Sequence, residues 1–515
     1  MLHNKLEKPY LLALAFVCGA AVLALEIVGT RVLGPFFGVT IYLWSALISV
    51  TLLALSIGYV VGGKVADRHP TLSLLSWLIL ASGLLVLLIP WIRRPIILFT
   101  EPLGLRLAVL ASSMLLFFVP LTLLGMVSPL LIKIKAKRLN ELGATVGGLY
   151  AVSTLGSVVT ALLTGYVLIP YVGVNLLLLI FGLMLVLAAT PGLITGKGRK
   201  SKAIAVFSLI ALASVAIVVT PVEAAAIDKG LLEVRQSAYS ELRVIEKSQG
   251  NARIRYLLMD GVAHSVVDPA SWNSYDYYNF IMDMLRDFHS AGDLLLIGLG
   301  GGSYAKSSSR KGWKVDALEI DPAVIDLAQE YFGLLPEDAN LFCVEGRRFL
   351  AQTEKKYDMI AMDAFGSSLI PFHLMTTEFF ELTKRHLKPN GILLINVVAL
   401  VKDDPLLGPL TATLKSQFRH VWAAPVFHPA NRTTNFVFFV SDTEYSAPAN
   451  EIIIMRYDGV LLNSSTVFSQ RLVPRSNPGQ ILSDDCSTAD ILSDQINLSL
   501  RRELHSNLQG AELSW

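Results

Sequence analysis

The sequence predicts a multi-pass α-helical membrane domain followed by an α/β Rossmann-like domain that begins with a small N-terminal antiparallel β-sheet. The first observation is composition: of 515 residues, 53% are hydrophobic and 16% are charged, against about 25% charged residues in a typical globular chain. The second is distribution, because residues 10–222 carry few charged side chains and residues 223–515 carry an ordinary share. The third is the alternation of apolar strands and helices around a glycine-rich loop.

The N-terminal part contains runs of apolar residues long enough to cross a bilayer. A helix needs about 20 apolar residues to span the hydrocarbon core, and helices satisfy their own backbone groups there. The first run is too long for a signal peptide and is followed by further runs. We expect seven spans, over residues 11–33, 41–63, 72–92, 107–132, 147–170, 174–194 and 203–220.

Small residues recur at four-residue spacing within these runs. Gly58 and Gly62 form one such pair, and Gly143 and Gly147 form another. Because glycine lets two helix backbones approach closely, the spacing predicts tight helix packing in the membrane domain.

The loops between the runs differ in Lys and Arg content. The N-terminus and the loops after the second, fourth and sixth runs carry most of these residues. Basic loops stay on the cytoplasmic side, so the sequence predicts a cell-membrane protein with a cytoplasmic N-terminus. Seven spans then place the soluble domain outside the cytoplasm, whereas a re-entrant run returns it inside.

Several classes of function receive no support from composition. The net charge is +2, so the chain lacks the basic field of a nucleic-acid-binding protein, and we expect no nucleic-acid partner. The three cysteines lie far apart and the nine histidines show no metal-ligand spacing. The sequence therefore predicts neither a disulfide framework nor a metal site.

We divide the chain into four segments. Residues 1–222 form the transmembrane domain, 223–290 a small β-hairpin domain with a linking helix, 291–445 a Rossmann-like nucleotide-binding catalytic domain, and 446–515 a C-terminal extension. In the second segment Glu241–Glu246 and Arg253–Met259 alternate as strands do, and Asp260-Gly261 is a hairpin signal. We expect a helix over Tyr275–Phe288 next.

The third segment alternates strands and helices around one glycine-rich loop. Leu294–Ile297 reads as a buried strand, and the loop that follows contains Gly298, Gly300 and Gly302, which let the backbone approach a ligand closely. We expect further strands over Val315–Glu319, Asn340–Val344, Met359–Asp363, Ile392–Val398 and Phe436–Val440.

Three acidic residues end successive strands of this predicted sheet. Ligands bind at the carboxyl ends of strands in such folds. Glu319 lies about 20 residues after the loop, where an acid accepts hydrogen bonds from ribose hydroxyls; the alternative is a surface acid. Glu345 is placed to bind an adenine amine. Asp363 is placed to take a proton from a nucleophilic amine; the alternative is a helix cap.

At these residues the chain resembles the spermidine synthase (polyamine aminopropyltransferase) family, and more closely its membrane-fused branch. The resemblance covers about residues 230–400 and a short tail segment. Its matching pieces are Ser237-Ala238-Tyr239, Leu258-Met259-Asp260-Gly261, Tyr275, the glycine loop, Glu319-Ile320-Asp321-Pro322, Glu345-Gly346-Arg347, Tyr357-Asp358 through Leu374, Glu378-Phe379, Leu387-Lys388-Pro389 and Leu482-Ser483-Asp484-Asp485.

The resemblance implies a class I methyltransferase-type fold and aminopropyl transfer from decarboxylated S-adenosylmethionine to an amine such as putrescine. Glu319 would then bind the ribose, Glu345 and Gly346 the adenine end, and Asp363 would deprotonate the acceptor. Tyr239, His264 and Tyr275 would line the acceptor site. Members of that family often pair, which implies a homodimer.

The sequence departs from the family pattern at several cation-binding positions. Gly301 stands where the synthases carry an Asp that binds the donor's amine, and Gly366 stands where a second Asp follows the catalytic one. Ser240 and His264 each replace a Gln. Each missing charge-assisted hydrogen bond is worth about 1.5–3 kcal/mol. His264 is either a substrate contact or base, or a hydrogen-bonded hairpin residue.

Two other functions therefore stay open. The glycine loop and Glu319 suit S-adenosylmethionine equally well, which favours a methyltransferase as the first alternative. The second is a transporter or scaffold with a nucleotide-binding domain, because the apolar runs are numerous enough to line a path.

Overall fold

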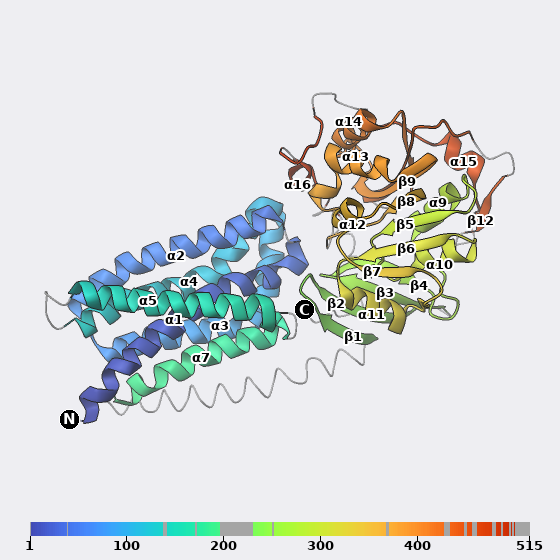
Figure 1. Ribbon diagram of the computed structural model, residues 1–515. Coiled ribbons are helices and arrows are strands. Elements are labelled where there is room, and N and C mark those ends of the chain that lie inside the picture. The colour runs from blue at the N-terminus through green and yellow to red at the C-terminus, as the bar shows by residue number, and fades with distance from the viewer. Residues whose placement is uncertain are drawn as a thin grey trace. The chain divides into compact units, whose positions relative to one another are not determined.

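The computed structural model describes residues 2–38, 40–136, 142–169, 172–195, 230–249, 252–366, 370–426, 433–446, 451–455, 461–475, 480–485, 488–493, 496 and 499. The chain forms two compact units, one mainly of residues before 229 and one mainly of residues after it. Each unit is described by itself (Figure 1).

The first unit is built of long apolar helices. Within the described residues, six of them are long and apolar enough to cross a membrane, and they cover the first six predicted runs. The seventh run, 203–220, lies outside the described residues, so the predicted topology stays a prediction. The bounds are α1 Leu2–Phe37, α2 Ile41–Arg68, α3 Leu72–Thr100, α4 Leu105–Lys135, α5 Leu142–Leu163 with the π-helical turn η3 Thr164–Leu168, and α7 Val174–Thr195; the short helix η1 spans Glu101–Leu103.

Glycines bring helices of this unit into backbone contact. A Cβ on Gly58 would lie 2.5 Å from the carbonyl oxygen of Thr122, and one on Gly62 would lie 2.6 Å from the Cα of Met126. The prediction is therefore confirmed for α2 against α4. At Gly143 and Gly147 a Cβ would meet nothing within 4 Å among the described residues, so close packing at this pair stays a prediction.

The second unit begins with a four-stranded antiparallel sheet in the order β1-β2-β3-β4. Its strands are β1 Leu231–Gln236, β2 Glu241–Gln249, β3 Ala252–Met259 and β4 Val262–Val267. The predicted hairpin turn joins β3 to β4, with φ of 46° at Asp260 and 78° at Gly261, as a type I′ turn requires. Leu242, Val244 and Leu257 pack on Leu327 of helix α11 (Pro322–Tyr331).

A seven-stranded sheet follows in the described part of the chain, in the order β10-β11-β9-β8-β5-β6-β7; Figure 1 shows the run from β9 to β7. Strands β9, β8, β5, β6 and β7 are parallel, whereas β11 runs antiparallel to both β9 and β10. The Rossmann-like fold class is confirmed, and β10 is a strand that the sequence reading missed. The bounds are β5 Asp293–Ile297, β6 Lys314–Glu319, β7 Asn340–Cys343, β8 Tyr357–Met362, β9 Leu387–Leu400, β10 His420–Pro425 and β11 Thr433–Ser441.

Helices cover both faces of this sheet because the strand residues alternate between two cores. Leu294 and Leu296 of β5 belong to a core with α9 and α10, whereas Leu295 and Ile297 belong to a core with α12, α13 and α14. A strand buried on both faces reads as a continuous apolar run. The helices are α9 Tyr277–Arg286, α10 Ser303–Arg310, α12 Gly346–Gln352, α13 Thr377–Arg385 and α14 Leu407–Gln417. Smaller elements are η4 Phe372–Leu374, β12 Ile453–Met455, β13 Leu461–Asn463, α15 Ser464–Ser469 and α16 Ala489–Leu492.

Candidate active site

The glycine loop joins β5 to α10 at the carboxyl edge of the sheet. Gly298, Gly300 and Gly302 have φ of 92°, 52° and 75°, a region that favours glycine. A Cβ on Gly298 would lie 2.3 Å from the carbonyl oxygen of Asp363. The loop therefore packs directly on the end of β8, and only glycine allows that approach.

Glu319 ends β6 beside this loop and is 9% exposed. Its carboxylate accepts backbone hydrogen bonds from Leu299 at 3.1 Å, Ile320 at 2.8 Å and Asp321 at 3.1 Å. Burial raises its pKa, and these bonds oppose the rise. A carboxylate has about four lone-pair sites, so roughly one remains, on the oxygen facing Leu299, for a ligand hydroxyl.

Glu345 follows β7 and caps helix α12. It accepts hydrogen bonds from the backbone of Arg347 at 2.9 Å and Arg348 at 2.7 Å, and lies 3.3 Å from Nε2 of His373. Burial opposes ionisation, but the bonds from His373 and the two amides lower the pKa of Glu345 to about 2. A Cβ on Gly346 would lie 2.5 Å from the Cγ2 of Ile297. The carboxylate of Glu345 is thus already engaged in holding its own helix.

Asp363 follows β8 and is held by two side chains from other elements. Asn396 of β9 donates to its Oδ1 at 2.8 Å, and the hydroxyl of Tyr278 on α9 also bonds to it. Asn435 of β11 donates to Asn396 at 2.8 Å and fixes its orientation. Burial raises the pKa of Asp363 to about 6, against both hydrogen bonds. A partly buried carboxylate with this pKa suits proton abstraction near neutral pH.

The helix-cap interpretation of Asp363 is wrong. The next regular helix, α13, is capped by Thr376, whose side chain accepts a hydrogen bond from the backbone of Phe379. The described residues that directly follow Asp363 are not helical. The carboxylate of Asp363 therefore bonds to side chains of α9 and β9 instead of to its own backbone.

Asp276 lies near Asp363 and was not singled out from the sequence. It immediately precedes α9 and accepts hydrogen bonds from the backbone of Val266 at 3.0 Å and from the hydroxyl of Ser274 at 3.3 Å. Burial raises its pKa to about 7, and the charge of Asp363 adds to the rise. The sequence predicts this helix over Tyr275–Phe288, whereas α9 begins at Tyr277, so Asp276 lies just ahead of the helix.

The three residues expected to line the acceptor site lie in different places. His264 is on β4, with its ring 6.4 Å from that of Phe365 in an edge-on contact. Tyr275 donates its backbone N–H to Val266. Tyr239 follows β1, where burial raises its pKa and the charges of Asp321 and Glu319 contribute, so it lies toward the predicted ribose residue. Among the tyrosines around Asp363, it is Tyr278 that hydrogen bonds to its carboxylate.

Gly301 shows why a carboxylate is absent from the loop. A Cβ at this position would lie 3.0 Å from the ring of Phe332 and 3.1 Å from the Cβ of Ser265. The backbone N–H of Gly301 also donates to Oγ of Ser265 at 2.7 Å. An Asp at this position would therefore require Phe332 and Ser265 to shift by a few tenths of an ångström.

The tail motif reaches the helix that Glu345 caps. Asp484 forms an ion pair with the guanidinium of Arg347 and accepts a hydrogen bond from Thr376 at 2.8 Å. The backbone N–H of Asp484 donates to Glu378 at 3.0 Å. The C-terminal extension thus stabilises the start of α12 from outside the sheet.

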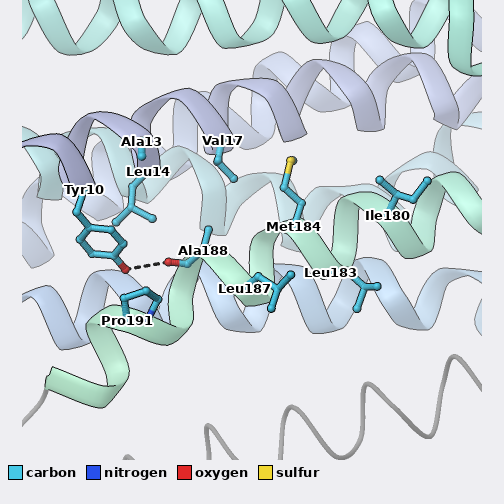
Figure 2. A pocket seen from close by; sticks show the side chains of 10 residues that line it. All are labelled: Tyr10, Ala13, Leu14, Val17, Ile180, Leu183, Met184, Leu187, Ala188 and Pro191. Atoms are coloured by element: carbon cyan, nitrogen blue, oxygen red, sulfur yellow. Dashed lines mark hydrogen bonds between the residues drawn. The ribbon is translucent and has the colours of Figure 1, made fainter.

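A hollow in the helical unit offers different chemistry (Figure 2). It has a volume of about 550 Å³ and is lined by apolar side chains of α1 and α7, including Leu14 and Met184. Its hydroxyl group belongs to Tyr10, which donates to the carbonyl oxygen of Ala188 at 2.8 Å and accepts from the backbone of Gly192 at 3.1 Å. Because that hydroxyl is engaged in both directions, we do not place the reaction there.

No cluster of three or more His, Cys, Asp or Glu side chains suited to a metal ion occurs among the described residues. The fold and the site together define a Rossmann-like domain with two acidic residues, Glu319 and Asp363, at the carboxyl edge of its sheet. Residues 277–446 match the spermine/spermidine synthase domain, which confirms the resemblance to that family seen in the sequence.

The matching relatives are aminopropyltransferases. A probable polyamine aminopropyl transferase of Bifidobacterium longum is 35% identical over 24% of this chain and 27% of its own length. The polyamine aminopropyltransferase of Vibrio vulnificus is 35% identical over 24% of this chain and 43% of its own. This chain thus spans less than half of either relative. A probable spermidine synthase from Corynebacterium glutamicum covers 43% of this chain and 82% of its own, at 21% identity and a TM-score of 0.38, which carries no further weight.

Proposed function

We propose that this protein is a membrane-bound transferase that moves an aminopropyl group from decarboxylated S-adenosylmethionine to an amine acceptor. The observation that carries the proposal is Asp363, a carboxylate with a pKa of about 6, bonded to Asn396 and Tyr278 at the end of β8. It lies against the glycine loop, within residues that match the spermine/spermidine synthase domain.

The proposed reaction needs positioning and one proton acceptor. The nitrogen of the acceptor attacks the propyl carbon bonded to the donor's sulfonium, a C–N bond forms, and the C–S bond breaks to leave methylthioadenosine. Asp363 takes the proton that the nitrogen loses. Holding both reactants in line supplies most of the remaining rate enhancement, with Glu319 as the proposed ribose contact and Glu345 and Gly346 at the proposed adenine end.

The apolar helices support attachment to a membrane. Six of them are long and apolar enough to span it, and soluble proteins do not expose such surfaces. The cytoplasmic N-terminus, the side on which the domain lies, the homodimer and the four segment boundaries stay predictions from the sequence. A reporter fused to the C-terminus would test the side directly.

The relatives named above are aminopropyltransferases and give no support to the methyltransferase or transporter alternatives. Calorimetry on the full-length protein in detergent tests the choice, with S-adenosylmethionine, its decarboxylated form and methylthioadenosine as ligands. We expect the decarboxylated donor to bind more tightly than S-adenosylmethionine, and we expect methylthioadenosine to form when putrescine or spermidine is added. Tighter binding of S-adenosylmethionine, with no aminopropylated product, would overturn the proposal in favour of methyl transfer.

A further inference from the structure

Asp276 is held in a fixed position by the segment between β4 and α9. Its carboxylate accepts from the backbone of Val266 at 3.0 Å and from Ser274 at 3.3 Å, while its own backbone N–H donates to the hydroxyl of Ser274 at 3.0 Å. The residue is partly buried. Such local bonds fix a carboxylate without neutralising it.

The neighbours of Asp276 supply further hydrogen-bond acceptors. Asn279, one turn along α9, is 6% exposed and donates its Nδ2 to Ser274 at 2.9 Å. Its Oδ1 is buried and has no hydrogen-bond partner. A buried polar atom without a partner is costly. The amide of Asn279 also contacts the Ser274 hydroxyl, which in turn donates to Asp276. The Oδ1 of Asn279 therefore lacks a hydrogen-bond donor close to Asp276.

The charged and titratable groups around Asp276 do not balance its charge. Asp363 carries the same sign, and Tyr278 and Tyr256 are phenols whose pKa values are raised by burial first and then by these carboxylates. Among the described residues, no Lys or Arg forms an ion pair with Asp276 or Asp363 within 4.0 Å. Asp276 and Asp363 therefore lie close enough to repel each other, and no Lys or Arg among the described residues pairs with either of them.

We propose that Asp276, supported by Asn279, is the specificity-determining residue that binds the positively charged nitrogen of the acceptor beside Asp363. This inference rests on the proposed function and adds the residue that selects the acceptor. An ammonium group has three donors and no acceptor, which matches Asp276, Asn279 and Asp363. Asp276 supplies a negative charge from the residue just before α9. It thereby replaces the carboxylate that is missing after β8, where this chain has Gly366.

The ionisation of the two carboxyls is consistent with this role. The repulsion from Asp363 contributes to the raised pKa of Asp276, and a bound cation would relieve that repulsion and favour both charged forms. Binding of a cationic acceptor is therefore expected to strengthen as the pH rises from 6 to 8, as Asp276 loses its proton in the empty site.

The test uses the full-length protein and Asp276→Asn, which keeps an oxygen for the backbone of Val266. Putrescine and 1,4-butanediol, its uncharged analogue, are titrated calorimetrically with methylthioadenosine present. We expect Asp276→Asn to weaken putrescine binding by about 10- to 100-fold, to leave methylthioadenosine binding within about twofold, and to leave the diol unaffected. Asp276→Glu should recover part of the affinity.

Asp268→Asn is the matched control, because Asp268 lies in the same connecting segment and its carboxylate accepts hydrogen bonds from the backbone of Ala270 and the hydroxyl of Ser271 in its own turn. Putrescine affinity in Asp276→Asn within twofold of the wild type overturns the inference, as does an equal loss in Asp268→Asn. If no aminopropyl transfer occurs but Asp276→Asn still loses putrescine binding, the proposed reaction fails and the cation site stands. If transfer occurs with an unchanged acceptor KM, the cation site fails and the reaction stands.

Discussion

Replacing Asp363 by Asn should abolish most of the proposed activity without disturbing the fold. Asn is the same size and keeps an oxygen for the Nδ2 of Asn396, 2.8 Å away in the wild type. With a pKa of about 6, Asp363 is about 90% ionised at pH 7 and only about 10% ionised at pH 5. General-base catalysis contributes about 10²- to 10⁴-fold, so kcat should fall by that factor while the Kd for decarboxylated S-adenosylmethionine stays within about twofold.

The assay is the formation of methylthioadenosine at saturating donor and varied putrescine between pH 5 and 9. In the wild type kcat/KM for putrescine should rise with pH and level off above about 8, because both Asp363 and Asp276 must lose their protons. The two carboxyls titrate as a coupled pair. In Asp363→Asn the rise of the pH profile should reflect the ionisation of Asp276 alone. It should move to lower pH, because the charge of Asp363 no longer raises the pKa of Asp276.

Asp358→Asn is the matched control for this experiment. Asp358 lies on β8, the strand that Asp363 follows, and its carboxylate bonds to Lys388 at 2.8 Å and to the backbone of Asp293 at 2.8 Å. Its replacement should lower stability and leave kcat within about threefold. The reasoning would be refuted if Asp363→Asn kept more than about a tenth of the wild-type kcat, or if its pH profile were unchanged.

Three further changes test the donor site, the tail and the helical unit. Glu319→Gln should weaken donor binding about 10- to 100-fold by calorimetry. The carboxylate of Glu319 accepts hydrogen bonds from backbone N–H groups on both oxygens, and the NH₂ group of Gln would face such a donor with no acceptor to offer. Asp484→Asn should cost at most about 1 kcal/mol in thermal unfolding, because its pair with Arg347 is partly exposed; a larger loss would mean that the tail does more than brace α12. Gly58→Val should destabilise the detergent-solubilised protein by about 1–3 kcal/mol through overpacking against α4, whereas Gly63→Val on the same helix, with nothing within 4 Å, should change it by less than about 0.5 kcal/mol.

The sequence was sufficient to place residues whose position follows from strand endings. Glu319 and Asp363 lie at the carboxyl ends of β6 and β8, because a short apolar strand ends where its buried run ends. The same reasoning placed Glu345 after β7. It did not reveal that the carboxylate of Glu345 caps α12, because capping depends on the backbone angles of the residue and not on its place after a strand.

Residues around the start of α9 show what periodicity does not determine. The sequence predicts a helix from about Tyr275, whereas α9 spans Tyr277–Arg286, so Asp276 lies ahead of the helix. Tyr275 is expected at the site through the family resemblance, whereas the tyrosine that bonds to Asp363 is Tyr278. Apolar periodicity alone singles out neither Asp276 nor Tyr278. Element boundaries are the least certain part of a sequence reading, and here one boundary decides which side chains enter the site.

Negative charge at the site is missing at Gly301 and present at Asp276. A pocket for a cationic ligand needs negative charge, but the fold does not require that charge to come from a particular element. At position 301 a Cβ would lie 3.0 Å from the ring of Phe332 and 3.1 Å from the Cβ of Ser265, so a carboxylate in the loop would require these neighbours to shift. Asp276 lies at an element start whose backbone bonds can hold an acid. Selection of the acceptor would then depend on Asp276, in the connection before α9, and the proton transfer would depend on Asp363, at the end of β8.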